Sequence, residues 1–307
     1  MISRRNIRVK VMQTLYTWST SNGSMSREQA TKQLMQHLAQ SRDLLLHLIY
    51  TIIETARYVE TDARQRASKH LPTAEDLSIN TKLAGNQLLW RMLELPSLQQ
   101  ALQEVKPERN ISSEWIRKIY HELIQTDTYQ QYLAQPERES KEERAILTFI
   151  FTDLLLPSEN FTGFIEELFV HWDDDSEMMN LLMLNFLQKP HTYNFQEFIS
   201  KEKLQYARDL LLAVIDKETL CNELIGAKLQ NWDPERTAVI DMILMRMGIC
   251  EFLYFETIPP KVTINEYIDL AKEYSTQQSG HFVNGILDSI HKDLVQENRL
   301  HKLSFKK

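Results

Sequence analysis

The sequence is poor in glycine and cysteine, and each shortage disfavours a class of fold or site. Only seven of the 307 residues are glycine, far below the ordinary share of about 7%. Such a composition disfavours β-rich folds and glycine-rich phosphate loops. Two cysteines, Cys221 and Cys250, are too few for a disulfide scaffold in a chain of this length, so we expect a reducing cytoplasm. Cys250 lies in an apolar stretch, which favours a buried structural thiol.

The fingerprints of common enzyme and metal sites are also missing. The sequence contains no GxGxxG, GxxxxGK[ST], GxSxG, CxxC or HExxH pattern. The acidic run HWDDDSE (171–177) lacks the alternating ligands and the glycine turn of a calcium loop, so we interpret it as a solvated helix start. The sequence shows no recognisable combination of a catalytic acid, a base and a nucleophile. We therefore expect no enzymatic activity, no cofactor, no metal site and no small-molecule substrate.

Long apolar runs are absent as well. Arg4 and Arg5 mimic a twin-arginine export signal, but such a signal needs a following apolar run of about 7–15 residues. Arg8 and Lys10 interrupt that run. No segment approaches the roughly 20 apolar residues of a membrane span. We expect neither export nor a membrane partner.

Charge is abundant but unevenly distributed. The whole chain carries 35 Lys and Arg against 42 Asp and Glu, a net charge of −7. Residues 101–195 hold 8 basic and 17 acidic side chains, whereas residues 1–10 hold four basic side chains and no acid. An overall negative charge argues weakly against nucleic-acid binding, but the basic start of the chain argues for it. The acidic segment is expected to avoid RNA and to stabilise the fold or present a protein-binding face.

The apolar periodicity predicts an all-α fold. Ile7, Val11, Leu15 and Trp18 follow helical spacing. Further helical patterns extend over most of the chain, and prolines stand between several of them. They cover residues 27–70, 80–94, 112–134, 139–156, 160–171, 176–188, 201–230, a helix that ends at about 254, residues 263–274 and a last helix from 279 onwards.

The stretch GHFVNGILD (280–288) combines a hairpin-turn dipeptide with helical spacing. Asn284-Gly285 is a strong turn signal, yet Phe282, Val283 and Ile286 recur on one helical face. We interpret the stretch as helical and expect the missing Cβ of Gly285 to let a neighbouring helix pack closely. On that interpretation a Gly285→Leu substitution would destabilise the fold.

The first helix is a candidate RNA-binding element. Arg4, Arg5 and Arg8 lie within one turn of each other, opposite an apolar face. Guanidinium groups suit phosphates and base stacking, and a helix N-terminus offers free N–H groups to a phosphate. The alternative is a solvated basic terminus without a function.

The last third of the chain carries a specific resemblance. The segment PPKVTINEYIDLAKEYSTQQSGHFVNGILD (259–288) strongly resembles the NusB family of bacterial transcription antitermination factors. YARDLLLAVIDKETLCNELI and AVIDMILMRMGICEF resemble the two preceding helices of that family, and RRNIRVKVMQTLYTW resembles its arginine-rich first helix. Together these segments cover about residues 1–22 and 197–296.

The resemblance implies a fold of two small helical bundles and a function in RNA binding. Family members bind the boxA element of ribosomal RNA transcripts together with the small-subunit ribosomal protein NusE, and the pair joins the RNA polymerase elongation complex. Because the family is about half as long as this chain, the organisation we expect is an arginine-rich first helix (1–24), an additional helical region (25–195) and a main domain (196–307). A weak echo between SRDLLLHLIY (41–50) and ARDLLLAVID (207–216) leaves a partial duplication open.

The resemblance also assigns site residues. The implied RNA surface contains residues of the first helix and of the loop before the last helix: Arg4, Arg5, Asn6, Arg8, Gln278, Ser279, His281 and Phe282. Phe282 would stack on a base, or alternatively would belong to the core with Ile286. Asp241 matches an acidic position at the ribosomal-protein interface, where some members have the longer Glu.

Two other functions stay open at this point. NusB-like domains are also fused to ribosomal RNA cytosine methyltransferases, but the seven scattered glycines do not suit the cofactor loop of such an enzyme. The chain would then keep only the RNA-binding part. Alternatively, the additional region would make the protein a helical interaction scaffold that has lost its RNA role.

Overall fold

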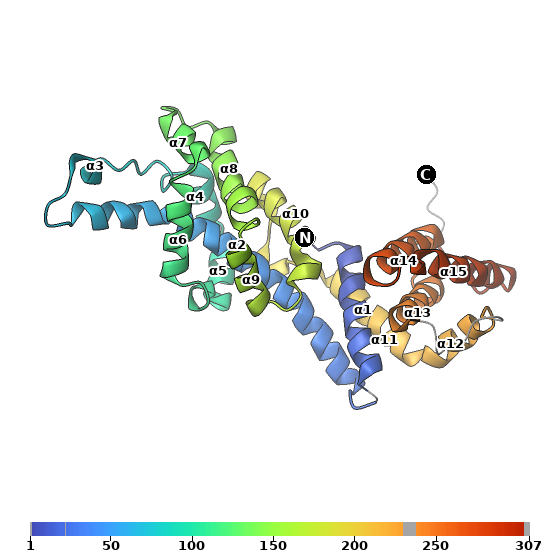
Figure 1. Cartoon of the computed structure of the whole chain (residues 1–307). Coiled ribbons are helices and arrows are strands. Elements are labelled where there is room, and N and C mark those ends of the chain that lie inside the picture. Colours follow the sequence, from blue (N-terminus) through green and yellow to red (C-terminus); the bar gives the residue numbers. More distant parts are fainter. Residues whose placement is uncertain (1, 22, 230–237, 304–307) are drawn as a thin grey trace. The chain divides into compact units, whose positions relative to one another are not determined.

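The structure, a computed structural model, describes residues 2–21, 23–229 and 238–303. Within these residues it contains helices and no β-strand (Figure 1), as the periodicity predicted. The α-helices are α1 (Arg4–Thr20), α2 (Arg27–Ala67), α3 (Ala74–Leu77), α4 (Gln87–Leu93), α5 (Pro96–Val105), α6 (Ser113–Leu123), α7 (Asp127–Ala134), α8 (Ser140–Phe149), α9 (Glu159–Leu168), α10 (Trp172–Gln188), α11 (Lys201–Asp216), α12 (Glu218–Gly226), α13 (Val239–Tyr254), α14 (Pro260–Tyr274) and α15 (Ser279–Gln296).

The helices form two compact units. The terminal unit comprises Ile2–Leu38 and Ile199–Lys307, and the inserted unit comprises Ala39–Phe198. The boundaries expected from the sequence were 24/25 and 195/196. The first boundary differs because α2 continues without a break from one unit into the other. No glycine, proline or loop marks that point, so the sequence carries no signal for it.

Helix α13 is the centre of the terminal unit. It packs against α1, α11, α12, α14 and α15. Most of its side chains are buried, which explains why its sequence is apolar on all sides rather than on one stripe. Cys250 of α13 is buried, as expected, with its Sγ 3.7 Å from the Sγ of Cys221 on α12.

The glycine that permits close packing is Gly248 rather than Gly285. A Cβ on Gly248 would lie 2.9 Å from Cδ2 of Leu287, where α13 meets α15. Gly285 is exposed within α15, and a Cβ there would meet no atom within 4 Å. The stretch around it is helical as predicted, but the close-packing role expected for Gly285 is wrong.

Several helix boundaries differ from the predicted ones. Helix α14 begins at Pro260, three residues before the start predicted at Thr263. Helix α5 was missed because Pro96, taken as a boundary, is its first residue. The predicted helices over 112–134 and 201–230 are each divided, at residues 124–126 and at Lys217.

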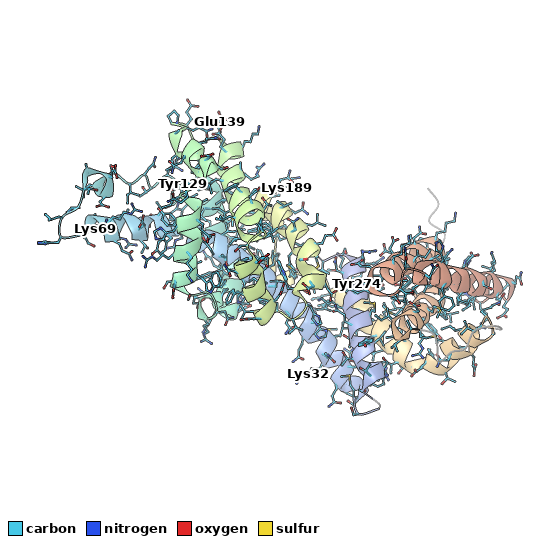
Figure 2. The ribbon with its side chains drawn as sticks, in the orientation of Figure 1. Lys32, Lys69, Tyr129, Glu139, Lys189 and Tyr274 are labelled. Carbon is cyan, nitrogen blue, oxygen red and sulfur yellow. The ribbon has the colours of Figure 1, made fainter. Side chains whose placement is uncertain are left out.

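The inserted unit consists of α3–α10 and the larger part of α2. Figure 1 shows α3 and the end of α2 extending beyond the other helices of this unit, with Lys69 labelled there in Figure 2. The acidic run 171–177 forms the first turn of α10, where carboxylates interact favourably with the helix dipole. Among the described residues no group of three His, Cys, Asp or Glu side chains could hold a metal ion.

None of the helices in the described part of the chain is long and apolar enough to cross a membrane.

Candidate nucleic-acid interface

The start of α1 is fixed by a capping box. Backbone N–H of Asn6 donates to Oγ of Ser3 at 3.2 Å, and backbone N–H of Ser3 donates to Oδ1 of Asn6 at 3.3 Å. Each side chain thereby satisfies a helix-terminal donor. The side chain of Asn6, predicted to bind RNA, is therefore occupied in holding the first turn of the helix.

Arg4 and Arg5 lie at the surface, and each is paired with a carboxylate. Nη2 of Arg4 lies 2.8 Å from Oε1 of Glu202 on α11, and Nη2 of Arg5 lies 2.8 Å from Oε2 of Glu273 on α14. Both arginine side chains are 38% exposed. The two guanidinium groups can reach a ligand from solvent, but an RNA phosphate has to compete with these carboxylates.

Arg8, in contrast, belongs to the interior. Its side chain is 2% exposed. Nε and Nη2 donate to the two carboxylate oxygens of Glu251 on α13 at 2.7 and 3.2 Å, and Nη1 donates to Oε2 of Glu266 on α14 at 3.1 Å. Lys10 is likewise buried. The structure thus gives Arg8 a structural role in place of the RNA contact predicted from the sequence, because the ion pair leaves no donor facing solvent.

Glu251 is the acceptor at the centre of this buried network. Besides Arg8 it accepts hydroxyl hydrogen bonds from Tyr206 at 2.5 Å, Tyr267 at 2.9 Å and Thr263 at 2.9 Å. Burial raises the pKa of both tyrosines well above 10, and the negative charge of Glu251 raises it further. Burial alone would lower the pKa of Arg8, but its interactions with Tyr267 and Glu251 outweigh burial and raise that pKa. Arg8 therefore stays protonated, and the network joins α1, α11, α13 and α14.

The loop between α14 and α15 presents the second group of predicted residues. Gln278 and His281 are exposed. The backbone oxygen of Gln278 accepts from the N–H groups of His281 and Phe282 at 3.2 Å each, which closes the first turn of α15. The side chain of Phe282 is half-buried, so part of it is accessible to solvent.

Ser279 and Asp241 are buried and bonded to each other. Oγ of Ser279 donates to Oδ2 of Asp241 at 2.7 Å, and their exposed fractions are 2% and 5%. Neither side chain reaches the surface in this conformation. The predicted RNA residue and the predicted partner residue therefore contact each other inside the terminal unit.

The first helix and the loop lie close together. Arg5 pairs with Glu273, the next-to-last residue of α14. Tyr274, labelled in Figure 2, ends α14 on the side where α1 lies. The loop bearing Gln278 follows directly. The structure thus brings the surface of Arg5 and the loop to one side of the unit, although the sequence separates them by more than 260 residues.

Sequence reasoning missed Lys272 as a member of this surface. Its side chain is 60% exposed, and its Cγ lies 2.8 Å from where a Cβ on Gly280 would stand. The absence of a side chain at Gly280 lets Lys272 lie across the start of α15. Only the helical-hairpin geometry reveals this, since Lys272 and Gly280 are not on one helix.

Comparisons with known proteins all point to one family. The sequence profile of the NusB family matches residues 167–292. The transcription antitermination protein NusB of Salinibacter ruber is 36% identical over 130 residues, which cover 42% of this chain and 74% of that protein. The protein of the same name from Methylacidiphilum infernorum is 40% identical over 101 residues, which cover 33% of this chain and 70% of that protein.

A third relative and one solved structure are also similar to parts of this chain. NusB of Chloroherpeton thalassium is 49% identical over 78 residues, covering 25% of this chain and 37% of that protein. The solved structure of T. maritima NusB is 35% identical and covers 32% of this chain and 72% of that chain, with a TM-score of 0.30. The profile match does not include α1, so the placement of Arg4 and Arg5 rests on the geometry above.

Proposed function

Because the chain belongs to the NusB family, we propose that it is a cytoplasmic transcription antitermination factor that acts by binding RNA. The family assignment also agrees with the expectation that it is not an enzyme. In finer detail, it binds boxA-type RNA of ribosomal RNA transcripts together with the ribosomal protein NusE, and the complex acts on the RNA polymerase elongation complex.

One observation carries the proposal for the site. The ion pair of Arg5 with Glu273 joins the exposed, basic start of α1 to the end of α14, directly before the loop that exposes Gln278. This creates one surface with cations, an amide and a half-exposed aromatic ring. That combination suits single-stranded RNA, which is bound by phosphate contacts and by stacking of unpaired bases.

The residues of this surface have distinct roles in the proposal. Arg4, Arg5 and Lys272 attract phosphates, and they supply the salt-dependent part of the affinity. Gln278 and His281 offer hydrogen bonds at the start of α15. The half-buried ring of Phe282 stacks on a base, and such stacking contributes roughly 1–3 kcal/mol.

The remaining predicted residues support the surface from within. Asn6 caps α1, Arg8 fixes α1 to α13 and α14, and Ser279 holds the loop. None of the three needs to touch RNA for its loss to weaken binding.

The partner protein is expected to complete the surface. A chain with net charge −7 repels RNA at long range, so a ribosomal protein that adds positive charge would raise the association rate. Asp241 is the proposed contact on this chain. Its Oδ1 is buried and accepts no hydrogen bond within the described residues, and a buried acceptor without a donor is costly. A donor from the partner would satisfy it.

The test is RNA binding by the purified full-length protein, measured by fluorescence anisotropy with and without NusE. We expect a boxA-type oligonucleotide to bind more tightly than a permuted sequence of the same composition, and NusE to increase the difference. Equal binding of the two sequences in the presence of NusE would contradict the proposal. Binding of NusE without any binding of RNA would favour the scaffold function instead.

A further inference from the structure

The carboxylate of Asp241 joins the starts of two helices. Asp241 stands in the first turn of α13, and Ser279 is the first residue of α15. The hydrogen bond from Ser279 Oγ to Asp241 Oδ2 is 2.7 Å long, and both side chains are buried. A hydrogen bond to a carboxylate in a buried environment is stronger than one between neutral groups at the surface.

The same hydroxyl organises the loop before α15. Backbone N–H of Thr276 donates to Oγ of Ser279 at 3.2 Å. The hydroxyl oxygens of Thr276 and Ser275 lie 2.8 and 3.0 Å from it. The loop therefore folds around the Ser279 hydroxyl, and Gln278 is the exposed residue next to it.

We propose that Asp241, acting through Ser279, is a positioning residue for the RNA-binding loop, and that it thereby links partner binding at α13 to RNA binding at α15. The RNA part and the partner part of this inference rest on the proposed function. Without the carboxylate, Ser279 loses its anchor and the loop samples conformations that do not bind RNA. The measured affinity then falls with the fraction of molecules in the binding conformation.

The second carboxylate oxygen explains how the partner would enter this link. Oδ1 of Asp241 is buried and has no hydrogen-bond partner within the described residues. A donor supplied to Oδ1 by the partner would stabilise the carboxylate in the orientation that holds Ser279. Since linkage is reciprocal, RNA bound at the loop would strengthen partner binding by the same factor.

The positioning role is tested first in the free full-length protein, without RNA. Amide hydrogen exchange over residues 276–282 should become faster in Asp241→Ala and in Ser279→Ala. Asp241→Asn should restore slow exchange, because its amide oxygen still accepts the hydroxyl. Asp209→Asn, which changes an exposed acid on α11, is the charge control, and circular dichroism verifies that each variant is folded. Unchanged exchange over 276–282 in Asp241→Ala would overturn the positioning role.

The link to RNA is tested by affinity for a boxA-type oligonucleotide. Asp241→Ala and Ser279→Ala should each weaken binding about three- to tenfold, as expected for one lost hydrogen bond. The double variant should be no more than twofold weaker than either single variant, and NusE should improve RNA affinity less in Asp241→Ala than in the wild type. Additive losses or an undiminished effect of NusE would overturn the link. A wild type that binds no RNA refutes the proposed function, and hydrogen exchange still decides the positioning role.

Discussion

At the residue scale, the basic start of the chain divides into surface and interior positions. Arg4 and Arg5 are partly exposed, whereas Arg8 is enclosed with Glu251. Arg8→Met should therefore lower the free energy of unfolding by about 3–5 kcal/mol, because removing one member of a buried pair leaves the other charge uncompensated. Urea denaturation followed by circular dichroism measures this.

The matched control is Arg4→Ala, which breaks an exposed pair worth about 0–1 kcal/mol. If Arg8→Met and Arg4→Ala unfolded at the same urea concentration as the wild type, the buried network would not stabilise the fold.

The burial of Arg8 could not be predicted from the sequence. The apolar positions Ile7, Val11 and Leu15 correctly marked the core face of α1, and all three are buried. Arg8 is buried as well, but its charge favoured an exposed position. The carboxylate that permits its burial is 243 residues away in the sequence, and a pairing over that distance leaves no local pattern.

Alanine substitutions at two glycines should change the stability of the fold in opposite directions. Gly285→Ala should raise the free energy of unfolding by about 0.5–1 kcal/mol, because alanine has the higher helix propensity and the site is open. Gly248→Ala should lower it, because the new Cβ would stand 2.9 Å from Leu287. Thermal or urea unfolding of both variants measures the two effects. A destabilising Gly285→Ala would restore the close-packing role that the sequence suggested.

At the element scale, carboxylates of α11 and α14 pair with Arg4 and Arg5 of α1, the arginines that we propose bind RNA. Glu273→Gln should strengthen RNA affinity about threefold at physiological salt, because Arg5 loses a competing anion and the local charge becomes more positive. Glu297→Gln, which removes a comparable exposed pair with Arg299, should have no effect. Anisotropy titrations of the two variants decide this, and weaker binding by Glu273→Gln would mean that Arg5 needs its carboxylate to face the RNA.

The elements themselves were largely predictable, and the exceptions have local causes. Amphipathic spacing correctly indicated α1, α2, α4, α8 and α10. Pro96 was ambiguous, since proline stands equally well between helices and at the first position of one. The start of α14 was misplaced because Thr263 and Glu266 have capping-box spacing, yet both side chains bond to the buried network instead.

At the scale of the whole molecule, the chain forms two compact units, and α2 contributes residues to each of them. Glu143 stabilises the inserted unit, where it accepts from Tyr132 at 2.9 Å and pairs with Arg138 at 3.3 Å. Glu143→Ala should lower the stability of residues 39–198 by about 1–3 kcal/mol. It should leave RNA affinity within twofold of the wild type, because the proposed surface lies wholly in the terminal unit.

Hydrogen exchange of peptides from each unit, together with an RNA titration, measures both effects in one variant. A tenfold loss of RNA affinity would place the inserted unit in the RNA-binding function, contrary to the expectation from its acidic sequence.

The organisation expected from the sequence, a family domain interrupted by a long additional helical region, rested on two observations. The matched family segments pointed to the terminal unit, and the extra length pointed to an insertion. The division inside α2 escaped notice because a continuous helix crosses it. The duplication suggested by the RDLLL echo stays a hypothesis, since helix vocabulary of this kind arises without common descent.

The central claim is that RNA binds to the surface formed by the start of α1 and the start of α15. The most direct test is the slope of log affinity against log salt for boxA-type RNA in the presence of NusE, in the wild type and in Arg4→Ala/Arg5→Ala. We predict weaker binding and a slope reduced by roughly 1.4, since each lost contact with a single-strand phosphate removes about 0.7. An unchanged affinity and an unchanged slope would contradict the claim.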